Sequence, residues 1–263
     1  MKKKNLLSAV LTVVLALAMC LSLAACGSSA APAATEAPAA DAAPAEVEAT
    51  ADGADVDTDK VFTVGICQLV QHEALDAATQ GFMDTLKEKF GDKVVFDVQN
   101  AAGDSAACST IVNSFVSKNV DLILANATPA LAAAYNATSE IPILGTAVTE
   151  YGVALGIDDF TGTVGGNVSG TSDLAPLDEQ ADMIIELFPD AKNVGLLYCS
   201  AEPNSEYQVK VVEEALAAKG VACTRYSFAD TNDVASVTTK AAADSDVIYI
   251  PTDNTAASCT ETI

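Results

Sequence analysis

From residue 61 onward, short apolar runs alternate with amphipathic stretches, and this alternation constrains the fold more than any other feature. Residues 61–67 form a β-branched apolar run. The stretch that follows carries Leu75, Ala78, Phe82 and Leu86 at three- and four-residue steps, the spacing of one buried helix face. Alternating strand and helix units of this size build a parallel sheet with helices on both faces.

The same rhythm occurs twice. In the first half it predicts strands at residues 61–67, 94–98, 121–125 and 141–147, and in the second half at 193–199, 222–228 and 247–250. Asp121 and Asp246 each begin an apolar strand that runs into a loop with hydroxyl side chains. We therefore expect an α/β fold: two Rossmann-like parallel-sheet lobes with a hinge and a cleft between them.

A glycine-rich stretch separates the two halves. We expect residues 61–160 to form the first lobe, residues 161–175 a hinge or crossover, and residues 176–263 the second lobe. If the strand spacing of the first half holds, a fourth strand of the second half would begin at about residue 267. The sequence therefore predicts that the second lobe is incomplete and that the chain is truncated at its C-terminus.

The N-terminal residues have the pattern of an export signal. Three lysines precede an apolar run at residues 6–21, and small residues then lead to Cys26. This ending resembles a bacterial lipobox, in which Cys26 is acylated after removal of residues 1–25. Residues 26–60 are rich in Ala, Pro and acidic side chains and cannot bury enough apolar surface to offset the entropy lost on ordering. This composition predicts a disordered tether. We expect an extracytoplasmic protein anchored by lipid to the outer face of a bacterial cell membrane, or held in a periplasm.

Composition argues against several classes of function. The chain carries 13 basic and 36 acidic residues, a net charge of −23, whereas nucleic-acid binding needs a basic surface. A single histidine leaves little for a metal site, and no phosphate-binding glycine motif with a Walker lysine is present, so no metal or cofactor is expected. Five cysteines follow Cys26, an odd number without paired spacing, and most are expected to be small buried residues.

Polar loops follow the expected strands, and in a parallel sheet such loops line the binding crevice. Hydroxyls, amides and helix N-termini suit a zwitterion, because helix N-terminal amides bind an anion and a carboxylate binds an ammonium group. Each loop taken alone also fits ordinary helix capping. The candidate ligand-binding residues are Gln68, His72, Asn126, Thr128, Thr146, Ser172, Asp173, Ser200, Asn204, Thr252, Asp253 and Asn254.

Five segments together carry a family resemblance, at residues 64–82 (VGICQLVQHEALDAATQGF), 125–130 (ANATPA), 145–149 (GTAVT), 165–173 (GGNVSGTSD) and 250–255 (IPTDNT). From residue 61 to the end, the chain resembles the ABC-transporter substrate-binding lipoproteins that include tryptophan and aromatic amino-acid receptors. The resemblance implies a type I periplasmic-binding-protein fold that closes on a ligand and delivers it to a membrane permease. The chain departs from the family in two ways. It lacks the segment that returns to the first lobe, and it has cysteines at Cys67, Cys108 and Cys199, where less reactive residues are expected.

The resemblance also implies a ligand and roles for the candidate residues. We expect a free amino acid, aromatic or large and apolar, bound by a monomeric protein without catalytic residues. Asp253 would bind its ammonium group, and the hydroxyls of Thr128, Ser172 and Thr252 its carboxylate. Two alternatives stay open: a lipoprotein ligand sensor that contacts a membrane kinase, and an amino-acid racemase that uses Cys67 and Cys199 as acid and base.

Overall fold

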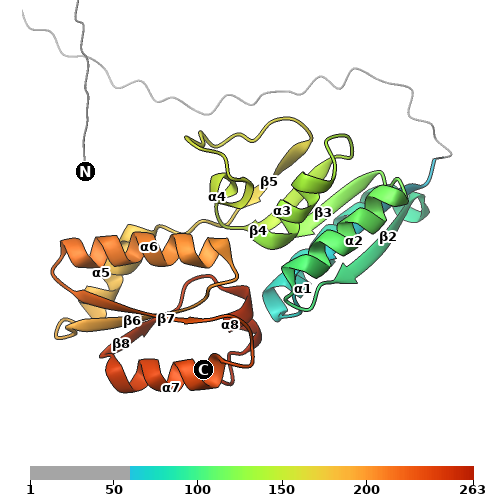
Figure 1. The fold of residues 1–263 in the computed structure, drawn as a ribbon. Helices are drawn as coiled ribbons and strands as arrows, with labels where there is room; N and C mark the ends of the chain where they lie inside the picture. Colours follow the sequence, from blue (N-terminus) through green and yellow to red (C-terminus); the bar gives the residue numbers. More distant parts are fainter. Residues whose placement is uncertain (1–59) are drawn as a thin grey trace, which may run out of the picture. The chain divides into compact units, whose positions relative to one another are not determined.

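The computed structural model describes residues 60–263, which belong to one compact unit. The predicted signal sequence, the lipidation site Cys26 and the tether lie outside the described residues. Two parallel sheets, each flanked by helices, form the described part (Figure 1). The predicted α/β class with two parallel-sheet lobes is confirmed.

Sheet A has five strands in the order β2-β1-β3-β4-β5. These strands are β1 (Phe62–Gln68), β2 (Val94–Asn100), β3 (Leu122–Asn126), β4 (Ile143–Val148) and β5 (Val168–Ser172). The helices between them are α1 (Glu73–Phe90), the 3-10 helix η1 (Gly91–Lys93), α2 (Ser105–Ser117), α3 (Thr128–Ala137) and α4 (Tyr151–Leu155). Each strand is parallel to its neighbours in the sheet.

The period-2 alternation of β1 divides its side chains between the two faces of sheet A. Val64 and Ile66 are buried in a cluster packed against apolar side chains of α1. Gly65 and Cys67 face the other side, where α2, α3 and α4 complete a second cluster. A Cβ at Gly65 would lie 2.6 Å from the ring of Phe115, so the absence of a side chain allows α2 to approach the sheet closely.

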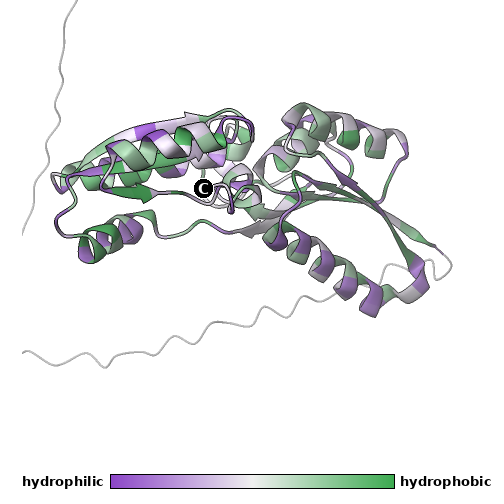
Figure 2. Cartoon of the chain, turned by 90° about the horizontal axis from the view of Figure 1, so that it is seen from below, coloured by the Kyte–Doolittle hydropathy of each residue, from purple (hydrophilic) through white to green (hydrophobic). Residues whose placement is uncertain are grey.

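Sheet B has three strands in the order β7-β6-β8. Its strands are β6 (Asn193–Cys199), β7 (Ala222–Phe228) and β8 (Val247–Tyr249), and its helices are α5 (Leu177–Leu187), α6 (Pro203–Ala218), α7 (Val234–Asp244) and α8 (Asn254–Ser258). Helices α5 and α6 cover one face and α7 the other (Figure 1). Apolar colouring is concentrated in the strands, while the helices carry hydrophilic stretches (Figure 2).

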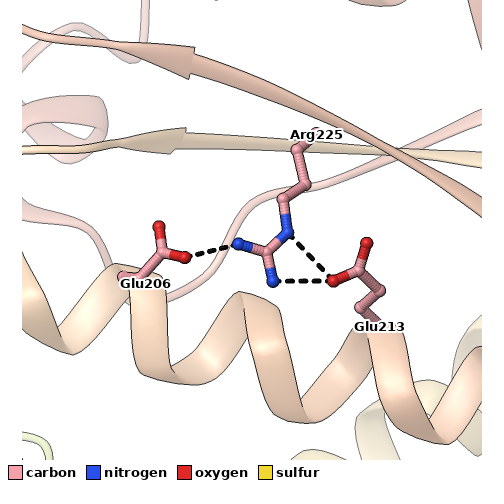
Figure 3. Close-up of polar contacts among 3 residues, drawn as sticks. All are labelled: Glu206, Glu213 and Arg225. Carbon is pink, nitrogen blue, oxygen red and sulfur yellow. Dashed lines mark hydrogen bonds and ion pairs between the residues drawn. The ribbon is translucent and has the colours of Figure 1, made fainter. Parts of the chain in front are cut away.

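An ion-pair cluster ties the edge strand of sheet B to a helix. Arg225 on β7 reaches two carboxylates of α6, those of Glu206 and Glu213 (Figure 3). The Nε and Nη2 atoms of Arg225 donate to the same Glu213 oxygen at 2.9 and 2.7 Å. These carboxylates raise the pKa of Arg225 above its ordinary value, since both stabilise its charged form.

The segment expected to be a hinge contains a strand. Residues 168–172 pair with β4 as the fifth strand of sheet A, so the first lobe extends beyond the predicted boundary at residue 160. The sequence of β5 (VSGTS) lacks an apolar alternation because four of its five residues are exposed at the sheet edge. Gly170 lies opposite Gly145, and a Cβ on Gly170 would be 2.2 Å from the Gly145 carbonyl oxygen. Glycine at position 170 therefore allows β5 to pair closely with β4.

Among the described residues, none of the helices has the length and apolar character that crossing a membrane requires.

Candidate functional site

Three predicted site residues lie side by side across sheet A. Gln68 is the register partner of Asn126, and Asn126 is the partner of Thr146 on the next strand. All three are at or near the carboxyl ends of their strands, where a parallel sheet places its ligand loops. Sheet pairing thus brings together residues from three separate strands.

Beneath this row, α1 holds the amides of Gln68 and Asn126 in place. The hydroxyl of Thr79 donates to Gln68 Oε1 at 2.7 Å and accepts from Asn126 Nδ2 at 2.9 Å. Gln68 Nε2 donates to Asp76 at 2.6 Å, and Asn126 Nδ2 also donates to the Leu75 carbonyl. Gln68 is therefore fully engaged in orienting the row, whereas the buried Oδ1 of Asn126 has no partner among the described residues.

The N-terminus of α3 follows Asn126 directly. Its N-cap, Ala127, has a left-handed φ of 90° and no side chain that could cap the helix. Thr128, the first helical residue, is only 2% exposed, and its hydroxyl has no partner within residues 60–263. Helix N-termini leave amide donors unsatisfied and carry a partial positive charge. This end of α3 can therefore accept a carboxylate, with the Thr128 hydroxyl as an additional donor.

In the second lobe, the segment 252–255, which leads from β8 into the first turn of α8, is fastened to the N-terminal part of α6 and its N-cap Glu202. Glu202 Oε2 accepts from Asn254 Nδ2 at 2.6 Å, and Glu202 Oε1 accepts from the Thr255 amide at 2.8 Å. Gln208 Oε1 accepts from the Thr252 amide, while its Nε2 donates to the Thr252 carbonyl. Asn204 donates to the same carbonyl, and its buried Oδ1 has no partner in the described chain.

The carboxylate of Asp253 already has a hydrogen-bond partner on each oxygen, unlike a carboxylate that is free to bind a ligand. Its Oδ2 accepts from the Cys199 amide at 2.6 Å, and its Oδ1 caps α8 by accepting from the Ala256 amide at 2.8 Å. The side chain is buried beside Glu202. Burial, followed by repulsion from Glu202, raises the pKa of Asp253 to about 6. Its carboxylate thus holds the loop 250–254 to the end of β6.

Besides Thr252, three predicted residues are exposed. The Ser172 hydroxyl donates to the Thr149 carbonyl at 2.7 Å, and the Ser200 hydroxyl donates to the Phe228 carbonyl at 3.2 Å. Asp173 follows β5 and donates its backbone amide to Val148. The hydroxyls of Ser172 and Ser200 are thus engaged with backbone carbonyls of neighbouring segments.

His72 and Asn254 bring loops of the two lobes together. His72 Nε2 lies 3.3 Å from Asn254 Oδ1, so the pair can hydrogen-bond when the imidazole carries its proton on Nε2. Beside this pair is a hollow of about 320 Å³. It is lined by His72, Ala74, Ile250, Pro251, Thr252, Asp253, Asn254, Ala256, Ala257, Thr260 and Ile263.

The sequence did not predict three residues that hold the candidate residues in place: Thr79, Glu202 and Gln208. Thr79 follows Leu75 by four residues on the buried face of α1, and Gln208 follows Asn204 by four residues on α6. That spacing places each pair on one helix face. The spacing shows that Thr79 and Gln208 lie on buried helix faces, but only the tertiary packing shows which segment each side chain contacts.

The cysteines of the racemase alternative are both buried. The hydrogen bond with Cys108 and burial raise the pKa of Cys67, and burial raises the pKa of Cys199. Each thiol is therefore held in its neutral form, and neither is exposed to a substrate. Within the described range, no group of three or more His, Cys, Asp or Glu side chains could hold a metal ion.

Comparisons with known proteins agree with this architecture. The family model described as "ABC transporter substrate binding protein" matches residues 63–263. A "Tyrosine-binding protein" of Clostridioides difficile (strain R20291) is 37% identical over 209 residues, and the match covers 78% of this chain and 60% of that relative. The chain thus spans less than two thirds of the curated relative's length.

Two solved structures are similar over 77% of this chain and 69% of their own. The ABC domain from Streptococcus pneumoniae in complex with L-Trp superimposes with a TM-score of 0.72 at 33% identity. A conserved domain protein from Vibrio cholerae superimposes with a TM-score of 0.73 at 36% identity.

Proposed function

Because the chain belongs to the ABC transporter substrate-binding proteins, a family of solute receptors rather than enzymes, we propose that it binds a free amino acid outside the cytoplasm and delivers it to a membrane permease. The family membership argues against the racemase alternative, and so do the thiols of Cys67 and Cys199, which are buried and neutral. A ligand sensor that contacts a membrane kinase would use the same pocket, and the family membership favours transport.

The observation that carries this proposal is the unpartnered buried polar group at the start of α3. The Thr128 hydroxyl is buried, has no hydrogen-bond partner among residues 60–263, and lies directly at an uncapped helix N-terminus. Burying such a group without a hydrogen bond costs about 1–3 kcal/mol, and an α-carboxylate would recover that cost through a charge-assisted bond. The unpartnered amide oxygen of Asn126 offers an acceptor for an ammonium group in the same region.

We propose an aromatic amino acid as the ligand. Two relatives that are similar over most of this chain are described as a tyrosine-binding protein and as a complex with L-Trp. In this arrangement Thr79, itself bonded to Gln68, holds Asn126, and Glu202 and Gln208 hold the segment 252–255. Asp253 would act through that loop, because its two oxygens already accept backbone amides.

Calorimetric titration of the purified chain with L-Tyr, L-Trp and L-Leu tests the proposal. Thr128→Val removes the hydroxyl with little change of shape, and we expect it to weaken binding of the preferred aromatic amino acid about ten- to a hundredfold. Thr110→Val, on the exposed face of α2, is the matched control and should leave the affinity unchanged. Equal affinities for the wild type and Thr128→Val would remove α3 from the carboxylate site. Absence of binding for every amino acid would contradict the receptor function.

A further inference from the structure

One pair of side chains connects the two lobes by a hydrogen bond. The first lobe ends with β5 and the second begins with α5. Nε2 of His72, in the first lobe, lies 3.3 Å from Oδ1 of Asn254, in the second. Within residues 60–263, no other hydrogen bond and no ion pair joins one lobe to the other. The polar connection between the lobes in the described chain therefore depends on this pair.

The contacts of Asn254 determine the direction of this hydrogen bond. Its Nδ2 lies 2.6 Å from Oε2 of Glu202, and its backbone amide lies 3.1 Å from the same oxygen. Because this carboxylate oxygen acts as an acceptor, the nitrogen side of the Asn254 amide faces Glu202. The oxygen side then faces His72, so Nε2 of His72 must carry the proton and donate it. The imidazole can reach Asn254 because it does not cap its own helix, α1.

Both ends of this connection are fixed to their own lobe. His72 is the N-cap of α1, and Leu75 in the first turn of that helix is buried in the core of the first lobe. Glu202 is only 3% exposed, and its other oxygen accepts from the amide and the hydroxyl of Thr255 at 2.8 and 2.7 Å. A bond to a carboxylate polarises the amide that donates it, which strengthens Oδ1 of Asn254 as an acceptor. His72, Asn254 and Glu202 thus form a continuous chain of hydrogen bonds between rigid elements of the two lobes.

The arrangement of the lobes agrees with a contact of a ligand-bound form. The chain superimposes on the L-Trp complex from Streptococcus pneumoniae with a TM-score of 0.72, and on the ligand-free, open structure of a substrate-binding protein from Clostridium difficile with a TM-score of 0.52. Both matches cover 77% of this chain, and the open structure is the more identical in sequence, at 37% against 33%. The described chain is therefore more similar in shape to the L-Trp complex than to the open structure.

We propose that the His72–Asn254–Glu202 chain of hydrogen bonds is a latch that holds the two lobes in their closed arrangement. Its consequence for binding rests on the proposed function. A contact made only in the closed state raises the fraction of closed molecules, and so slows the release of a ligand bound between the lobes. His72 and Asn254 then act as positioning residues for closure, in place of the direct ligand contacts expected from the sequence.

Nuclear magnetic resonance of the imidazole tests whether the latch forms. His72 is the sole histidine of the chain, so its ring signals in proton–nitrogen spectra have no counterpart elsewhere. We expect its Nε2 proton to exchange with water about three- to tenfold more slowly in the wild type than in Asn254→Ala. The measurement is made on the purified chain alone and after addition of L-Tyr or L-Trp, whichever binds more tightly. Equal exchange in the wild type and Asn254→Ala under both conditions would overturn the latch.

Variants of the two residues measure the consequence for binding. His72→Phe keeps an aromatic ring but removes the donor, and Asn254→Ala removes the acceptor. We expect each to weaken binding of the same amino acid about three- to tenfold, through faster dissociation. His72→Gln, whose side-chain amide can donate from nearly the same position, should retain most of the affinity. Gln71→Ala, which changes the exposed neighbour of His72, is the matched control and should bind like the wild type.

The double variant of His72→Phe and Asn254→Ala separates a latch from two independent effects. Because both substitutions remove the same hydrogen bond, the double variant should bind within about twofold of the weaker single variant. Losses that multiply in the double variant would overturn the latch, as would wild-type affinity of His72→Phe. If no amino acid binds, the receptor function fails, and the exchange of the Nε2 proton in the chain alone still decides whether the latch exists.

Discussion

At the scale of single residues, two carboxylates lie side by side at the start of α6 and α8. Asp253 and Glu202 are each only 3% exposed, and both accept several hydrogen bonds from the loops that they join. Burial and the neighbouring charge raise the pKa of Asp253 to about 6 from its ordinary 3.8. The folded chain therefore holds a proton on Asp253 at pH values where the unfolded chain has released it.

This proton has a measurable consequence for stability. Between about pH 4 and 6 the folded state binds more protons than the unfolded state, so the contribution of Asp253 to the free energy of unfolding is present below pH 4 and is lost as pH rises through 6. We expect a loss of about 2–3 kcal/mol over this window, measured by urea unfolding without ligand. Asp253→Asn should flatten the slope.

Asp246→Asn is the control for this measurement. Backbone amides of Lys192 and Asn193 lower the pKa of Asp246, so its titration lies below the window and the slope between pH 4 and 6 should persist. A wild-type stability that rises from pH 4 to 6 would contradict the raised pKa of Asp253.

At the scale of elements, the approach of helices to the sheets is decided by a few side chains. Gly65 leaves room on β1 for the ring of Phe115, whereas Gly81 on α1 has open space within 4 Å of the position that an added methyl group would take. The same substitution therefore has opposite effects at the two glycines. At Gly65 the effect of the substitution is determined by packing between elements, and at Gly81 only by the backbone entropy of the helix.

We expect Gly65→Ala to destabilise the chain by about 1–3 kcal/mol, since the new methyl group would force α2 away from sheet A. Gly81→Ala should stabilise it by about 0.5–1 kcal/mol, because alanine favours the helical conformation without any new contact. Chemical denaturation of the two variants beside the wild type measures both effects. A neutral Gly65→Ala would show that α2 does not depend on this close approach.

At the scale of the whole molecule, the N-terminal pattern and the family membership both bear on the cellular location in which the chain functions. The predicted lipobox ends at Cys26, and the receptor family functions outside the cytoplasm. We propose that a lipid on Cys26 holds the folded part near the membrane that contains the permease.

Cys26→Ser should prevent acylation, because the lipid is attached to the thiol. In a bacterial host fed with labelled palmitate, the wild type should carry the label and partition with membranes, while Cys26→Ser should carry none. Cys223→Ser removes a thiol from the folded part and should label like the wild type. Label on Cys26→Ser equal to that of the wild type would contradict the anchor.

Much of the fold followed from periodicity. Strands β6 and β7 have the predicted bounds, because buried faces impose regular apolar spacing. Strand β5 was missed, since an exposed edge strand shaped by Gly170 has no such spacing. The carboxyl-end rule also located the row of Gln68, Asn126 and Thr146, because parallel pairing aligns strand ends.

The tertiary structure alone decided what each of these side chains does. It committed Asp253 to two backbone amides and left Thr128 without a partner among the described residues. These outcomes depend on contacts between residues far apart in the chain, as with Thr79 beneath Asn126 and Glu202 beneath the segment 252–255. Local spacing records which face of an element is buried, but the hydrogen-bond partner and the local dielectric of a group depend on which distant segment packs against it.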